Sequence, residues 1–94
     1  MIEFELPLTV AITTWRDQDY IVNAVKSVLD IADNIIIVYG RLKDIDLEKP
    51  DNTLDILKHL QIDYPAIITI VSQYSWNSEA ERLNSAWFNA MGYF

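Results

Sequence analysis

The sequence predicts an α/β fold in which helices pack on a parallel β-sheet. Three short apolar segments rich in β-branched residues alternate with three segments of helical periodicity, in the order β-α-β-α-β-α. Such alternation produces parallel strands joined by right-handed helical crossovers. The predicted class is therefore a three-layer, Rossmann-like α/β fold, and the 94 residues form a single domain without internal repeats.

The first β-α unit consists of a predicted strand at residues 8–12 and a helix that follows Asp17. The strand segment is apolar apart from one threonine, which is typical of a buried strand. Asp17 is a residue type that favours the N-cap position of a helix. The apolar side chains that share one helical face are Tyr20, Ile21, Ala24, Val25, Val28 and Leu29.

The second unit begins with a strand at residues 35–38, which is apolar on both faces as central parallel strands are. Residues 39–50 are largely polar, and we expect them to form a long loop. Asp51 is positioned to cap a second helix. The side chains expected to point inward from that helix are Leu54, Leu57 and Leu60.

The third unit follows Pro65, which interrupts the chain. Residues 67–71 are predicted to form a strand, and Ser78 with Glu81 fits a capping box at the start of a third helix. The residues expected on its buried side are Leu83, Ala86, Trp87 and Ala90. The predicted strand order is 3-2-1, with the first strand at an edge. Pattern alone also allows a flavodoxin-like or receiver-like domain.

Composition argues against several classes of partner. Seven Lys and Arg stand against fourteen Asp and Glu, for a net charge of −7, and no basic cluster suits a nucleic acid or an anionic membrane. The apolar runs are too short to span a bilayer, and residues 1–6 lack the basic start of a signal peptide, so we expect a cytoplasmic protein. One histidine and no cysteine leave no zinc set or catalytic triad.

Four motifs follow one another in the order and at the spacings of a known family. Residues 10–17 match a strand with a Pro-Thr-Tyr-Asn-like turn, and residues 26–29 match a helix that ends in Ser-Val-Leu. Residues 34–40 match the family's second strand, and residues 51–53 match its Asp-Asn-Thr. Residues 83–92 match Leu-Asn-x-Ala followed by Ala-x-Gly. The chain thus resembles the nucleotide-sugar-binding, N-terminal half of a family 2-type glycosyltransferase, a partial GT-A fold.

The resemblance implies a nucleotide-sugar donor, in the first place a UDP-sugar, and sugar transfer to an unknown acceptor. It also implies a divalent metal, Mn or Mg, held by an Asp-x-Asp motif whose family position lies beyond Phe94. We therefore expect the 94-residue chain to be inactive alone. The family's acidic pair after the second strand is replaced here by Tyr39 and Gly40, which leaves base recognition to other groups.

Ligands of parallel sheets bind beyond the carboxyl ends of the strands. The predicted nucleotide-binding residues there are Thr13, Thr14, Trp15, Tyr39, Gly40, Arg41 and Arg82. Trp15 is expected to stack on the base, Gly40 to permit a close backbone approach, and Arg41 to reach a phosphate or the base. Arg82 lies one turn into the third helix, whose N-terminus suits a phosphate. The competing interpretation makes these residues ordinary turn, core or surface positions.

Other features favour structural interpretations. Asp44, Asp46 and Glu48 alternate in the predicted loop and are interpreted as solvated residues, not as metal ligands. The alternative function is a non-catalytic α/β binding or interaction module. Because an unpaired apolar edge strand recruits partners, self-association through residues 8–12 is also expected.

Overall fold

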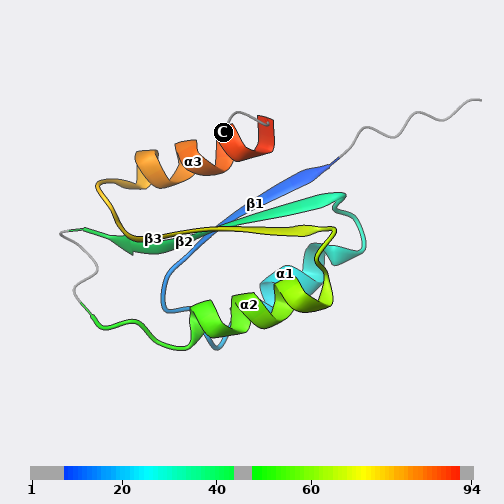
Figure 1. The fold of residues 1–94 in the computed structure, drawn as a ribbon, viewed down its shortest axis with the longest axis horizontal. Helices are drawn as coiled ribbons and strands as arrows, with labels where there is room; N and C mark the ends of the chain where they lie inside the picture. Colours follow the sequence, from blue (N-terminus) through cyan, green and yellow to red (C-terminus); the bar gives the residue numbers. More distant parts are fainter. Residues whose placement is uncertain (1–7, 44–47, 92–94) are drawn as a thin grey trace, which may run out of the picture.

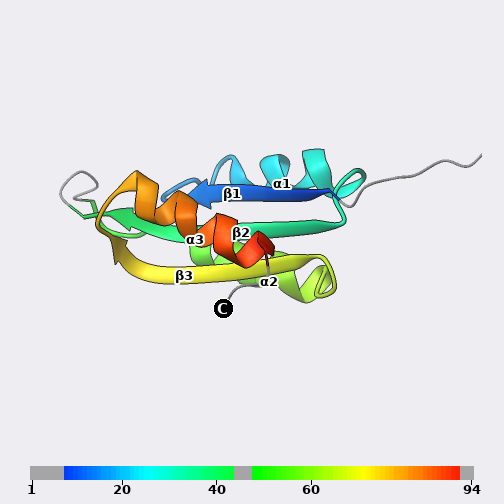
Figure 2. The same ribbon diagram turned by 90° about the horizontal axis from the view of Figure 1, so that it is seen from above.

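The computed structural model describes residues 8–43 and 48–91, with side chains described through residue 86. The elements along these residues are β1 (Thr9–Thr14), α1 (Ile21–Leu29), β2 (Asn34–Leu42), α2 (Thr53–Asp63), β3 (Ile68–Trp76) and α3 (Glu79–Met91). They form a parallel sheet in the order β1-β2-β3, with α1 and α2 on one face and α3 on the other (Figures 1 and 2). The predicted α/β class, element order, strand order and three layers are confirmed.

The central strand β2 supplies side chains to both faces of the sheet. Ile35, Ile37 and Tyr39 belong to the core under α1 and α2, whereas Ile36 and Val38 belong to the core under α3. All five are at most 6% exposed. Full burial of each such apolar side chain contributes on the order of 1.5–3 kcal/mol. The two-faced apolar run in the sequence therefore has the central position that it predicts.

The helix α1 starts later than the sequence indicates. Its N-cap is Tyr20, and the Asp17 side chain instead accepts hydrogen bonds from the Thr14 hydroxyl and the Trp15 amide, at 2.6 and 3.2 Å. The predicted Asp17 cap is wrong because this turn has its own polar partners for the carboxylate. Tyr20 is 73% exposed and Ala24 is also exposed, so the buried face is narrower than expected.

The cores of the other helices agree more closely with the sequence. Leu57 and Leu60 are buried under α2, and Leu54 is half-buried. At α3, the Ser78 hydroxyl accepts the Glu81 amide at 3.2 Å, which is the N-cap half of the predicted capping box.

Three of the four residues predicted on the buried side of α3 are not confirmed there. Leu83 is 50% exposed, contrary to expectation, because α3 turns Arg82 and Ala86 toward the sheet instead. The side chains of Trp87 and Ala90 lie outside the described ones.

Strands β2 and β3 are longer than predicted. The sequence places the end of β2 at Val38, but the strand continues to Leu42 through an irregularity in its pairing with β3 between Tyr39 and Arg41. Gly40 has φ +147° there, a backbone conformation that side chains disfavour. The start of the predicted 39–50 loop is therefore strand, because a glycine permits the bulge and does not end the strand.

Strand β1 lies at an edge of the sheet, as predicted. Association of copies through that edge stays a prediction. Within residues 8–43 and 48–91, no helix has the length and apolar character needed to cross a membrane.

Candidate functional site

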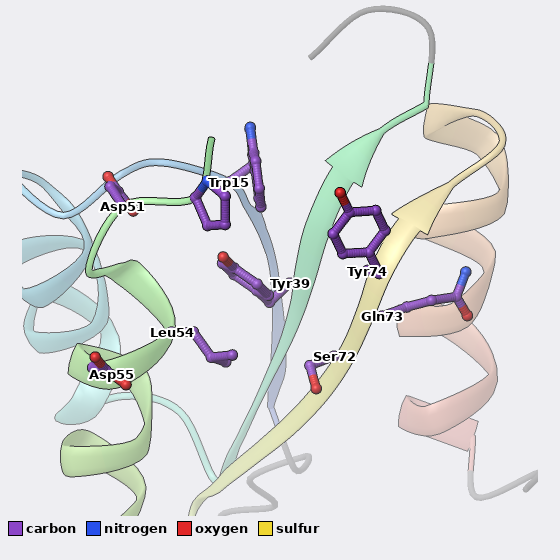
Figure 3. A pocket seen from close by; sticks show the side chains of 9 residues that line it. Trp15, Tyr39, Asp51, Leu54, Asp55, Ser72, Gln73 and Tyr74 are labelled. Atoms are coloured by element: carbon purple, nitrogen blue, oxygen red, sulfur yellow. The ribbon is translucent and has the colours of Figure 1, made fainter. Parts of the chain in front are cut away.

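A cavity of about 350 Å³ lies at the carboxyl end of the sheet, on the side of α1 and α2 (Figure 3). Its walls come from the β1–α1 turn, β2, the start of α2 and β3, and the lining residues are Trp15, Tyr39, Pro50, Asp51, Leu54, Asp55, Ser72, Gln73 and Tyr74. The position is the one where parallel α/β sheets bind ligands, because loops from successive strands converge there. Its size falls within the range of small-molecule sites.

Three aromatic side chains, Trp15, Tyr39 and Tyr74, line the cavity. The Trp15 and Tyr39 ring centroids are 5.5 Å apart, with their planes tilted by 48°. Tyr39 is almost fully buried and lies between the start of α2 and Tyr74 of β3 (Figure 3). Trp15 is half-buried, so part of its ring remains available to a ligand. Such rings give a planar ligand both a face and an edge to contact.

The opposite wall carries two carboxylates, Asp51 and Asp55. Asp51 is held in place, because its Oδ1 accepts hydrogen bonds from the Thr53 amide at 2.9 Å and the Thr53 hydroxyl at 2.6 Å. The Thr53 hydroxyl in turn accepts the Asp17 amide at 2.8 Å. These bonds connect the start of α2 to the β1–α1 turn that carries Trp15, so both walls of the cavity are fixed to each other.

Asp51 is not the N-cap of α2, contrary to the prediction. Asn52 occupies the N-cap position of α2, but Asp51 still satisfies the amide of the first helical residue. Asp55 lies in the first turn of α2, where the helix dipole favours a negative charge.

The cavity has a negative electrostatic character. Burial, together with the charges of Asp51 and Asp55, raises the pKa of Tyr39 above 10.0, so its hydroxyl keeps its proton. Burial by itself would raise the pKa of Asp51, but the hydrogen bonds from Thr53 and Gln18 and the charge of Arg16 outweigh it and lower the pKa below 3.8. Asp51 is therefore ionised at neutral pH.

Of the seven predicted site residues, the structure brings Trp15 and Tyr39 into the cavity. Thr13 pairs with Val38 inside the sheet, and Thr14 is 2% exposed with its hydroxyl bonded to Asp17. These two threonines support the turn and do not line the cavity.

The remaining predicted residues surround the bulge in β2. A Cβ on Gly40 would lie 2.3 Å from the Gln73 carbonyl oxygen and 2.5 Å from the Trp76 Nε1, so the close approach at this glycine is to protein. The Arg41 guanidinium lies 4.9 Å from the centre of the Tyr74 ring, beside the cavity. Arg82, on α3, is 9% exposed, donates to the Gly40 carbonyl at 2.9 Å and pairs with Glu79.

The acidic loop residues do not form a metal site in the part of the chain that is described. Asp44 and Asp46 lie outside the described residues, and Glu48 pairs with Arg16. Among the described residues, no three Asp, Glu, His or Cys side chains converge on one point.

Sequence reasoning missed much of the cavity wall. Leu54 is expected from the sequence only to point inward from the second helix, and Asp55 is not singled out there. No protein-family model, curated protein or solved structure matches this chain.

Proposed function

We propose that this chain is a glycosyltransferase-like domain that binds the nucleoside part of a nucleotide-sugar donor. The observation that carries the proposal is the aromatic cavity at the carboxyl ends of the parallel strands, where Trp15 and Tyr39 adjoin two carboxylates. The sequence resemblance independently places the nucleoside at the same strand ends.

The aromatic wall supplies the attraction for a base. Stacking of a base on an aromatic side chain contributes on the order of 1–3 kcal/mol. Trp15 is only half-buried, so a base can reach its ring, and the tilted Tyr39 ring forms the adjoining part of the cavity wall. A base held against Trp15 can leave its ribose near Asp51, whose carboxylate can accept hydrogen bonds from sugar hydroxyls.

The charges decide where the phosphates go. No Lys or Arg is among the described residues that line the cavity, and Asp51 and Asp55 repel a diphosphate. The proposed ligand therefore places only base and ribose inside, with the diphosphate directed to the rim beside Tyr74, where Arg41 lies. Without a metal ion to offset the repulsion between the diphosphate and the carboxylates, we expect weak binding, with a Kd of about 1 mM, equivalent to roughly −4 kcal/mol.

Titration of the chain with UDP and GDP, followed by NMR, tests this proposal. Trp15→Ala should weaken binding about tenfold, because it removes the stacking surface. The matched control is Tyr20→Ala, which removes an aromatic ring that is 73% exposed and lies outside the cavity. Equal weakening by both variants, or none by Trp15→Ala, contradicts the proposal.

A second candidate is a non-catalytic binding module with the same pocket. The observation that favours it is the state of Asp17, the acid next to the first strand end, whose carboxylate is engaged by Thr14 and Trp15 and so is poorly placed to act as a general base. A radiolabelled nucleotide-sugar assay with Mn²⁺ or Mg²⁺ tests the module. Donor turnover above background excludes the module, whereas binding without turnover is expected of both candidates, because the chain is expected to be inactive alone.

A further inference from the structure

The hydrogen-bonding groups of the cavity are unequal in kind. When ionised, the Asp51 and Asp55 carboxylates can accept hydrogen bonds but cannot donate them, and Tyr39 contributes a single hydroxyl. Asp51 already accepts two hydrogen bonds from Thr53 at its Oδ1. Asp55 lines the same cavity from the first turn of α2.

The placement of Asp55 suits the edge of a flat ligand. It lies on the wall formed by the start of α2, across the space in which Tyr39 and Tyr74 are seen (Figure 3). Leu54 and Pro50 flank that wall with apolar surface. A planar base that lies between Trp15 and the start of α2 can turn one edge toward this carboxylate.

The nucleobases differ sharply in what they offer to a carboxylate. Guanine presents two adjacent donors, N1–H and the N2 amino group, which match the two oxygens of a carboxylate in a bidentate pair. Uracil presents one N–H between two carbonyl oxygens, which the carboxylate repels. Cytosine and adenine each present an amino group beside a ring-nitrogen acceptor. Guanine is thus the base whose pairing edge is complementary to this wall.

We propose that the cavity selects guanine among the nucleobases, with Asp55 as the residue that determines this specificity. The inference rests on the proposed function, because it assumes that a nucleoside occupies the cavity. It replaces the uridine expected from the sequence resemblance with a purine that donates two hydrogen bonds. The acidic wall, which repels phosphate, then favours a base that donates hydrogen bonds to it.

NMR titration of the chain with the 5′-monophosphates of guanosine, inosine and uridine tests the inference, because the three ligands carry the same phosphate. We expect guanosine monophosphate to bind about tenfold more tightly than uridine monophosphate, in line with the discrimination of a bidentate contact. Inosine monophosphate, which lacks the N2 amino group, should fall between them.

Asp55→Asn should remove this preference, because the amide replaces one acceptor with a donor that opposes the guanine edge. The control is Asp63→Asn, which makes the same charge change at the other end of α2, outside the cavity, and should leave the preference intact. Equal binding of the guanine and uracil ligands, or a preference that survives in Asp55→Asn, overturns the inference while the proposed function stands. Failure of all three ligands to bind overturns both.

Discussion

The two faces of the sheet use the same strand for different purposes. On the α1 and α2 face, the row Ile35, Ile37 and Tyr39 ends in a ring that forms part of an open cavity. On the α3 face, the row Ile36 and Val38 continues to Gly40, where protein fills the space. The end of β2 therefore adjoins a cavity on the face of Tyr39, whereas packed protein atoms fill the space beside Gly40 on the face of α3.

The contacts of Trp76 show how the α3 face differs from the cavity face. Its indole N–H donates to the Tyr39 carbonyl at 3.1 Å, from a buried position packed with Ile36, Val38 and Ala86. The Tyr39 side chain meanwhile lies in the cavity on the other face. The α3 face thus fixes the backbone whose side chains form the candidate site, and changes on that face should affect stability before they affect binding.

The largest expected effect is that of Gly40→Ala. The substitution puts a Cβ at a residue with φ +147° and 2.5 Å from the Trp76 Nε1. Backbone strain and overpacking together should lower the free energy of unfolding by about 3 kcal/mol. Urea denaturation followed by circular dichroism measures this, and an unchanged midpoint would show that the bulge relaxes freely.

A smaller loss is expected for Arg82→Met, which keeps the aliphatic stem but removes the bonds to Gly40 and Glu79. The unsatisfied Gly40 carbonyl should reduce the free energy of unfolding by about 1–3 kcal/mol. Lys58→Met, at an exposed position on α2, is the surface control. If Arg82→Met instead weakens the binding of a nucleoside diphosphate to the folded chain, the phosphate role predicted from the sequence is correct.

The smallest expected effect concerns the Asp51 network on the cavity face. Because the folded pKa of Asp51 is lowered, its contribution to stability is present above 3.8 and is lost as the pH falls through the folded value. The stability difference between wild type and Asp51→Asn should therefore shrink in acid. Denaturant midpoints of both proteins between pH 7 and pH 3 measure it, and a difference independent of pH would contradict the assignment.

The sequence predicts the topology well because the relevant signals are local. Apolar runs such as residues 35–38 and the Ser78 capping box are visible within a few residues. The misplaced features depend on contacts between distant segments. Asp17 loses its capping role to a turn joined to Thr53, 36 residues away, and Gly40 continues a strand because Trp76 packs over it.

The same reasoning accounts for the candidate site. Trp15 and Tyr39 were predictable because they directly follow strands, and strand ends meet at one edge of a parallel sheet. Arg82 was assigned to a phosphate from the position of its helix, but α3 crosses to the opposite face and buries it. Asp55 lines the cavity only because α2 packs beside β3, which no local pattern reveals.

The most direct test of the central claim compares two indole signals in one titration. Trp15 lines the cavity, whereas the Trp76 indole is buried on the α3 face and bonded to Tyr39. As guanosine or uridine monophosphate is added, the Trp15 indole N–H resonance should shift with saturation, and the Trp76 indole resonance should move much less. Shifts confined to Trp76 and α3, with Trp15 unmoved, would contradict nucleoside binding in this cavity.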